Sequence, residues 1–278
     1  MSLRDLNWRG IRAVMTKDLT VVLRTKMVVL PMILMPVFLQ VLMPAGFGLA
    51  AYLAGDSIAG ESNDLDTMIQ WMPEEEQQRF EEQSPGQVFL EIMLVYAFAP
   101  MYLIIPMMVS SVIAADSFVG ERERKTMEAL LYTPLTDSEL LLAKMLTAWF
   151  AAVTVGVGSF LLYILVVKLV GLLVVGGIAF PNLMWLVLVF WVSPAVAGLG
   201  LGVTVLVSRR VNTFQEAYQL GSMIVLPVVA LMIGQFAGVL TLSVLLAIGI
   251  GAGVWLINAL IFWFGVKTFN RDTLIARL

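Results

Sequence analysis

The densest run of charged side chains in this sequence lies within residues 117–139. Five charges follow one another at 121–125, and Glu128 comes three residues later. Lys125-Thr126 resembles the end of a phosphate-binding loop, GxxxxGK[ST], but Val119 and Arg124 occupy the two glycine positions of that loop. The segment therefore binds no ATP by this route. Its charges either keep a capped loop in water or offer a docking element to a partner.

The same segment has the pattern of a helix, a turn and the start of a second helix. Two pairs of opposite charges stand four residues apart and favour the first helix: Glu121 with Lys125, and Arg124 with Glu128. Thr133-Pro134 ends this helix, because proline cannot continue it. Thr136 and Glu139 then form a capping-box pattern, which predicts that a new helix begins there.

The sequence contains neither cysteine nor histidine. Without histidine there is no HExxH zinc site, no serine–histidine pair and no histidine proton relay. An intramembrane aspartyl protease is disfavoured as well, because it needs two aspartates and Asp116 is the only one close to the interior of an apolar stretch. A nucleic-acid partner would need a basic face, whereas the formal net charge is −3.

Apolar stretches long enough to cross a bilayer must position the charged segment. Hydrophobic residues make up 60% of the 278 residues and charged residues only 13%, about half the share in a soluble domain. The charge-free stretches are 27–55, 92–115, 145–167, 169–208 and 217–266. Since roughly 20 apolar residues cross a bilayer, the last stretch holds two spans, joined near 238–241. We assign one span to 169–208, after an apolar outer or re-entrant connection at 169–180. The predicted fold is an all-α polytopic membrane protein with six transmembrane helices.

Lysine and arginine indicate which side of the membrane is cytoplasmic. If the spans alternate from a cytoplasmic N-terminus, fifteen of the 17 lysines and arginines lie inside, and the exceptions are Arg79 and Lys168. Both termini and the segment 117–139 are therefore predicted to be cytoplasmic, in a multi-pass protein of the cell membrane. The stretch 55–88 becomes an acidic extracellular loop, which is either simply solvated or attracts cations to a pore mouth.

Residues 3–25 have the pattern of an amphipathic interfacial helix on the inner membrane surface. Its apolar stripe has three- and four-residue spacing: Trp8, Ile11, Met15, Leu19 and Val22. A soluble helix would show the same pattern, but the direct connection to a span at Met27 favours the membrane surface.

Prolines and glycines inside the spans predict where helices bend and where they pack closely. Pro31, Pro36 and Pro44 in the first span, and Pro100 and Pro106 in the second, remove backbone hydrogen bonds and predict bends. Two sets of glycines predict close packing, one in the fourth span and one in the sixth: Gly198, Gly200 and Gly202, and Gly249, Gly251 and Gly253.

Residues 121–144 resemble the intracellular connection of ABC-2 type transporter permeases, where E-R-E-x-G-T-L-E-x-L-L-x-x-P-x-x-x-x-E-x-x-x-G-K follows the second span. Most fixed positions are kept, from Glu121-Arg122-Glu123 through Thr126-Met127-Glu128 and Leu130-Leu131 to Pro134, Glu139 and Lys144. Lys125 and Ala143 stand where the family often has glycine. Weaker resemblances follow in the family's order at Lys17-Asp18-Leu19, at Ser208–Gln219 and at Phe269–Leu274.

The resemblance implies one transmembrane domain over 1–278 that serves as the permease subunit of an ATP-driven ABC transporter, in most such systems an exporter. It implies two copies of an ABC ATP-binding subunit, a second permease chain, identical or related, and membrane lipid as partners. ATP and Mg would be bound by the ATP-binding subunit, so this chain is expected to need no cofactor and to be no enzyme. A cytoplasmic coupling helix between spans two and three, and the N-terminal helix, would carry the ATPase-coupling residues: Glu121, Arg122, Glu123, Thr126, Glu128, Leu131, Lys17 and Asp18.

A self-contained secondary transporter or channel is the alternative. It would use the charges that border the apolar stretches, namely Glu91, Asp116, Lys168 and Glu216. All four lie near the ends of predicted spans, which favours interfacial roles over a proton relay.

Overall fold

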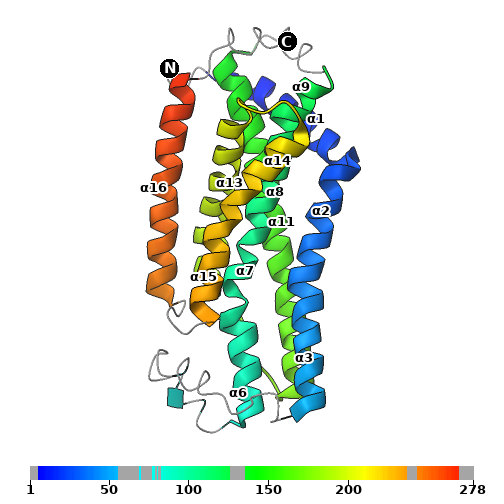
Figure 1. Cartoon of the computed structure of the whole chain (residues 1–278), viewed down its shortest axis with the longest axis vertical. Coiled ribbons are helices and arrows are strands. Elements are labelled where there is room, and N and C mark those ends of the chain that lie inside the picture. The colour runs from blue at the N-terminus through cyan, green and yellow to red at the C-terminus, as the bar shows by residue number, and fades with distance from the viewer. Residues whose placement is uncertain are drawn as a thin grey trace.

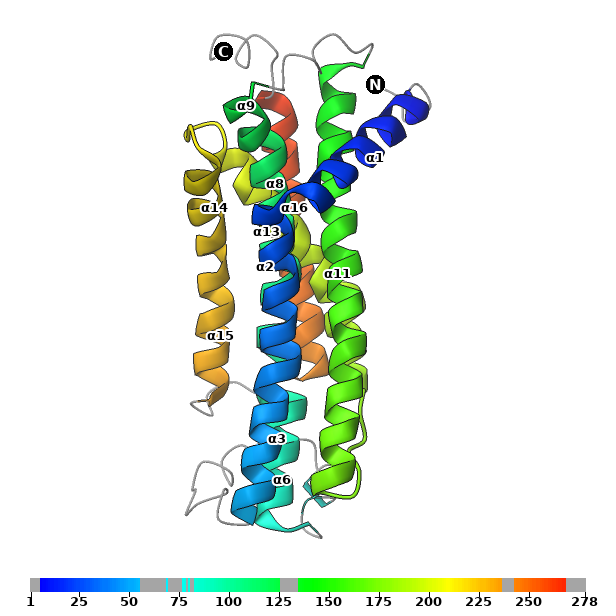
Figure 2. The same cartoon turned by 90° about the vertical axis from the view of Figure 1, so that its right-hand side faces the viewer.

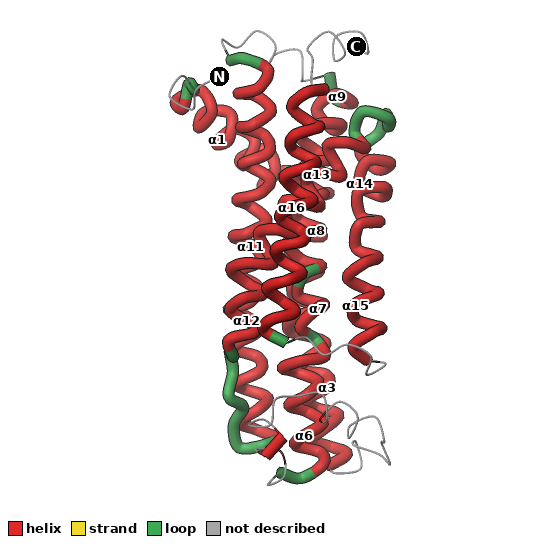
Figure 3. Tube along the Cα trace, turned by 90° about the vertical axis from the view of Figure 1, so that its left-hand side faces the viewer, coloured by secondary structure: helices red, strands yellow, loops and turns green. Residues whose placement is uncertain are grey.

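The computed structural model describes residues 6–55, 69, 77–78, 80, 83–125, 135–236 and 243–268. Six helices in these ranges are long and apolar enough to cross a membrane: Lys26–Ala54, Pro85–Glu123, Ser138–Val174, Leu183–Val207, Phe214–Gln235 and Val244–Trp263. They run side by side along the long axis of the molecule (Figure 1), and the described residues include no strand (Figure 3). The predicted all-α fold with six spans is confirmed.

Most spans are built from several helical segments that follow one another closely. Span 1 consists of α2 (Lys26–Val37), the π-helix η2 (Phe38–Leu42) and α3 (Met43–Ala54). Span 2 consists of α6 (Pro85–Glu91), η4 (Ile92–Ala97), α7 (Ala99–Tyr102), α8 (Ile104–Ala115), η5 (Asp116–Gly120) and α9 (Glu121–Glu123). Span 3 is the single helix α11 (Asp137–Val174). Span 4 consists of α12 (Leu183–Val187), η6 (Leu188–Val192) and α13 (Ser193–Val207). Span 5 consists of α14 (Phe214–Ser222), η7 (Met223–Val225) and α15 (Leu226–Phe236), and span 6 is α16 (Val244–Thr268).

Span 2 forms the centre of the bundle, and spans 5 and 6 lie at its edges. Every residue of α8 but one is buried, and α8 packs against α11, α13 and α14. By contrast, α15 and α16 expose large apolar side chains such as Ile233 and Leu256, and α16 forms the left edge in Figure 1. Apolar side chains on the outside suit a protein whose solvent is lipid rather than water.

Proline disturbs the helices of spans 1, 2 and 4 as its chemistry requires. The π-helices η2, η4 and η6 end two or three residues before Pro44, Pro100 and Pro194. Because proline lacks an N–H and its ring crowds the preceding turn, the carbonyl groups there must find other donors, and a wider π turn is one way to rearrange them. The predicted disturbances of spans 1 and 2 therefore coincide with π turns at two of the predicted prolines.

Side chains from three other spans hold the π-helix η4 in place. Tyr163 of α11 donates to the carbonyl oxygen of Leu94. Trp185 of α12 donates to that of Val95 at 2.7 Å, and Gln235 of α15 to that of Tyr96, also at 2.7 Å. Three consecutive carbonyl groups are thus satisfied by spans 3, 4 and 5, which matters because water is absent from the membrane interior.

Two expectations about the spans require correction. The helix α11 continues to Val174, so the connection between spans 3 and 4 covers 175–182 and not 169–180; the assignment of a single span after it is correct. Of the glycines, Gly198 and Gly202 face Asn258 and Ile261 of α16, as predicted for a packing face. In the second set only Gly251 has a close neighbour, the ring of Trp191, whereas a Cβ atom on Gly249 or Gly253 would meet no described atom within 4 Å.

Candidate functional site

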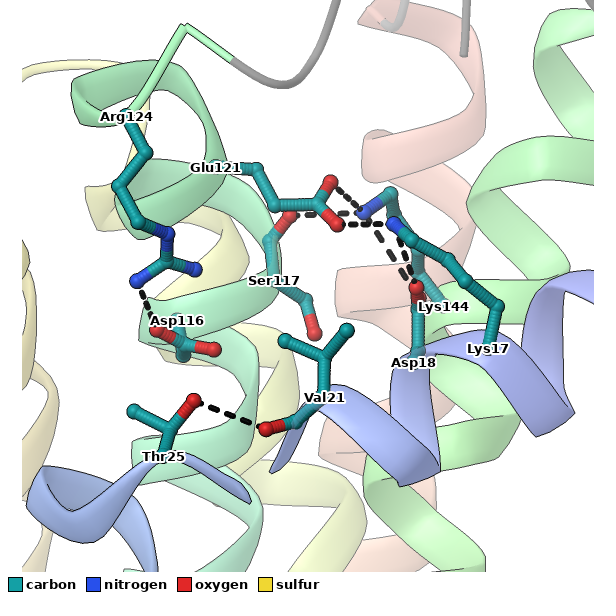
Figure 4. A network of polar contacts seen from close by, with 9 residues as sticks. All are labelled: Lys17, Asp18, Val21, Thr25, Asp116, Ser117, Glu121, Arg124 and Lys144. Carbon is teal, nitrogen blue, oxygen red and sulfur yellow. Dashed lines mark hydrogen bonds and ion pairs between the residues drawn. The ribbon is translucent and has the colours of Figure 1, made fainter. Parts of the chain in front are cut away.

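Charged side chains from three helices meet at one end of the bundle (Figure 4). These helices are α1 (Trp8–Arg24), the η5–α9 end of span 2 and the start of α11. Lys144 of α11 lies at the centre, with 1% of its side chain exposed. Its Nζ donates to Glu121 Oε2 at 2.5 Å and to the carbonyl oxygen of Ser117 at 2.8 Å, and lies 3.7 Å from Asp18 Oδ2. The three positions around the ammonium group are therefore occupied by two carboxylates and one backbone carbonyl.

The local fold explains how these partners reach Lys144. Asp18 lies on the same face of α1 as Ile11, Val14 and Val22, the face that is buried against α11. Figure 2 shows α1 crossing the upper part of α11. On span 2, η5 is a π-helix, in which the amide of Glu121 bonds to Asp116 five residues earlier. The carbonyl group of Ser117 in this wider turn accepts from Lys144.

Lys17 adds a second ammonium group at the edge of the cluster. Its Nζ donates to Glu121 Oε1 at 2.5 Å and lies 3.1 Å from Asp18 Oδ1. Burial lowers the pKa of Lys17, but the hydrogen bond to Glu121 and the charges of Asp18 and Glu121 outweigh burial, so that this pKa is raised above its usual value. Lys17 thus stays protonated at neutral pH, and its contribution to stability is lost only when the pH rises through the raised pKa.

Asp18 is held by charge more than by hydrogen bonds. Its side chain is 2% exposed and contacts both ammonium groups, yet neither carboxylate oxygen accepts a hydrogen bond of good geometry from the described residues. A buried carboxylate is costly unless cations neutralise it. Lys17 and Lys144 must therefore stay where they are for α1 to keep this position.

A further ion pair lies on the other side of η5. Arg124 donates from Nη1 to Asp116 Oδ1 at 2.9 Å, and this hydrogen bond raises the pKa of the guanidinium. The pair passes directly over Gly120, where a Cβ atom would come within 2.7 Å of Asp116 Oδ1. Glycine at 120 is thus what lets the two side chains meet.

The capping box predicted at the start of α11 is present and also binds the N-terminal segment. The hydroxyl of Thr136 accepts from the amide of Glu139, and Glu139 Oε2 accepts from the amide of Thr136 at 2.8 Å. The other carboxylate oxygen of Glu139 accepts from the amide of Asn7 at 2.7 Å. The start of α1 and the start of α11 are therefore tied together as well.

The comparison with protein families decides the identity of the chain. The family model described as "ABC-2 family transporter protein" matches residues 12–266. The chain belongs to the ABC-2 transporter family. It is a multi-pass membrane protein with the role of an ABC permease, a membrane component of a transport system, and permeases of this family typically work with an ATP-binding subunit. No curated protein and no solved structure matches the chain significantly.

The structure brings only some of the predicted coupling residues of this ABC-2 permease together. Lys17, Asp18 and Glu121 form one cluster, while Arg122 and Glu123 turn toward the connection between spans 4 and 5. Thr126, Glu128 and Leu131 lie outside the described residues.

Several expectations about this segment are wrong. Residues 121–123 are the last turn of span 2 and not the start of a separate helix. Span 2 ends there, and Arg124 and Lys125 form a turn. The structure places Lys17 and Lys144 at Glu121 instead of the predicted Lys125, and Glu121 is buried. Arg124 binds Asp116, and its predicted pairing with Glu128 lies outside the described residues.

The buried face of α1 also differs from the predicted stripe. Val14 and Asp18 belong to it, whereas Trp8 and Leu19 are exposed. Most of the helix predicted at 3–25 is present as Trp8–Arg24, and its position at a membrane surface stays a prediction.

Proposed function

We propose that this ABC-2 permease couples ATP hydrolysis by a separate ATP-binding subunit to movement of a substrate across the cell membrane, most often outward. The observation that carries the proposal is the buried cluster of Lys144, Glu121 and Asp18, with Lys17 at its edge. It joins the end of span 2 to α1 and to span 3, so a force applied at α9 acts on three helices at once.

The described end of α9 supports a contact with another protein. Directly after α9, Arg124 and Lys125 are exposed, whereas Glu121 beneath them is buried. We assign the direct contact to this exposed end and to the adjoining residues Thr126, Glu128 and Leu131, with Lys17 as a second contact. The buried Glu121 and Asp18 would transmit the force instead of touching the partner.

The position of α9 supports a cytoplasmic docking side. The start of α1, the start of α11 and the end of α16 lie at the same end of the bundle as α9 (Figure 1). Arg9, Arg12, Arg24 and Lys26 are exposed there, and such residues favour the cytoplasmic side. We propose that this end, with both termini, faces the cytoplasm.

The assembly that we propose contains two permease chains, identical or related, and two ATP-binding subunits that bind ATP and Mg. Spans 5 and 6 expose most of their surface in the single chain, which supports contact with a partner chain or with lipid in the membrane. This chain supplies the path and needs no cofactor of its own.

A secondary transporter that works without ATP is less well supported by the positions of its candidate charges. Glu91 and Asp116 lie 25 residues apart in span 2, on the order of 35 Å along a helix, so they cannot exchange a proton directly. Asp116 is already paired with Arg124, and Lys168 and Glu216 are exposed on the outside of the bundle. The four charges thus form no continuous pathway within the described part of the chain.

Reconstitution tests the proposal. The tagged chain is purified from native membranes, an ABC ATP-binding subunit that accompanies it is identified by mass spectrometry, and the two are reconstituted in liposomes. We expect vanadate-sensitive ATP hydrolysis that changes when the permease is present. Transport driven by an ion gradient alone, with no ATP-binding subunit in the purified material, would contradict the proposal.

A further inference from the structure

The connection between spans 4 and 5 is held by two consecutive residues of α9. Helix α13 ends at Val207, and α14 begins at Phe214. The guanidinium of Arg122 donates to the carbonyl oxygen of Val211 and, at 3.4 Å, to that of Ser208. The next side chain, Glu123, accepts from the amide of Phe214 at 2.9 Å. One turn of span 2 therefore binds both ends of this connection.

The charge of Glu123 matches the helix end that it binds. Arg122 binds two carbonyl groups of the connection, and the one at Ser208, directly after α13, lies at a helix end where a cation is favourable. The first amides of a helix carry partial positive charge, so the carboxylate of Glu123 is favourable at the start of α14. Thr213 already accepts from the amide of Glu216, and Glu123 satisfies a different amide of the same turn. Both bonds involve an ionised group, which makes them stronger than neutral hydrogen bonds.

An apolar contact lies beside these bonds. Ala115 and Val119 of span 2 pack with Val211 and Ala217, and all four are buried. The side chains of Phe214 and Tyr218 lie against the same cluster. α14 is therefore seated on the end of span 2 through both polar and apolar contacts.

Span 5 also packs against α8 and α13 along α14, and against α7 along α15. Only a small part of its surface is buried in the chain, and its other end is held to span 2 by the hydrogen bond of Gln235 to Tyr96. A displacement of α9 itself would reach the start of span 5 directly through Arg122, Glu123 and the apolar contact beside them.

We propose that Arg122 and Glu123 are positioning residues that transmit the movement of α9 to spans 4 and 5 within this chain, and that they are not contacts with the ATP-binding subunit. The inference rests on the proposed function and extends it. Glu121 carries the movement to α1 and span 3, and its two neighbours carry it to spans 4 and 5.

Spin labels test, without any partner protein, whether Arg122 and Glu123 hold α14 against α9. The chain has no cysteine, so Lys125→Cys and Gln219→Cys place one label at the end of α9 and one on the exposed side of α14. We expect a narrow distance distribution in the otherwise unchanged chain and a broad one after Arg122→Gln with Glu123→Ala. Arg9→Gln, which neutralises an exposed charge elsewhere at this end, should leave it narrow. An unchanged distribution in the double variant would overturn the inference.

The complex with the ATP-binding subunit then separates positioning from contact. The double variant should retain assembly within about twofold and lose permease-dependent ATP hydrolysis by about tenfold, the factor that one lost hydrogen bond to a charged group can produce. Loss of assembly would show that the two residues are contacts, against the inference. If the unchanged chain itself forms no such complex, the proposed function fails, and so does the proposal that Arg122 and Glu123 transmit movement to spans 4 and 5. The label distances still decide whether these two residues hold α14 against α9.

Discussion

Lys144 and Glu121 form an ion pair of 2.5 Å between span 3 and the end of span 2, and the two side chains are 1% and 5% exposed. Replacing Lys144 by methionine would leave Lys17 as the cation that contacts Glu121 and Asp18 among the described residues. We expect the variant to lose about 3 kcal/mol of stability, because removing one partner of a buried ion pair leaves an uncompensated charge. The measurement is the midpoint of thermal unfolding in detergent.

Two controls accompany Lys144→Met. Lys168→Met removes an exposed lysine of the same helix and should change stability by less than about 0.5 kcal/mol. Adding Glu121→Gln to Lys144→Met removes one unpaired charge and should recover part of the loss. Equal midpoints for Lys144→Met and Lys168→Met would show that the cluster does not hold the helices together.

Lys125 has a backbone conformation that suits glycine better than lysine. Its φ angle is +55°, in the left-handed region, and related permeases often have glycine at this position of the motif. We expect Lys125→Gly to stabilise the chain by about 0.5–1 kcal/mol, because the Cβ atom strains this conformation. Lys125→Ala keeps the strain and should give no gain. A loss of stability in Lys125→Gly would mean that the side chain makes a contact worth more than the strain.

The hydroxyl of Tyr163 donates to the carbonyl oxygen of Leu94 in the π-helix η4. Tyr163→Phe should cost about 1 kcal/mol, since this buried hydrogen bond is then lost. Tyr52→Phe makes the same chemical change at an exposed site and should have little effect. The measurement is the midpoint of thermal unfolding of the two variants under one set of conditions. Similar midpoints would show that the hydrogen bond of Tyr163 to η4 does not stabilise the chain.

Gly200 lies where spans 2 and 4 approach each other closely. A Cβ atom there would come within 2.7 Å of the carbonyl oxygen of Met107. Gly200→Ala should therefore force α13 away from α8 and cost about 1–3 kcal/mol. Gly249→Ala, where no described atom lies within 4 Å, is the matched control in the isolated chain. If both variants unfold at the same temperature, the two helices pack less closely than the structure shows.

The spans could be predicted from the sequence because the property that creates them is local. Charges are expensive within a bilayer, so the spacing of charges alone locates six apolar helices. The capping box at Thr136 and Glu139 is local in the same sense, since its partners are three residues apart. The end of α11 differs from the prediction because the helix carries the exposed Lys168 within it, so this charge does not mark the end of the span.

The charged cluster could not be predicted in the same way, because its partners are far apart in the sequence. Helical spacing predicts Lys125 as the partner of Glu121, yet its observed partners lie 104 residues before it and 23 residues after it. The sequence does contain one local signal of the cluster. Asp18 follows Val14 by four residues and precedes Val22 by four, which places a carboxylate within an apolar face and implies a buried cation. Lys144, at the start of an apolar stretch and in the family motif, was the available candidate.

The most direct test of the central claim is a cross-link between the end of α9 and the ATP-binding subunit. Since the chain has no cysteine, Lys125→Cys provides a single attachment point for a reagent that joins a thiol to a nearby amine. Ala179→Cys, exposed in the connection between spans 3 and 4 at the opposite end of the bundle, is the control. The account predicts a cross-linked product of permease and ATP-binding subunit from Lys125→Cys and none from Ala179→Cys. A product from Ala179→Cys alone, or from neither site in an intact and active complex, would contradict it.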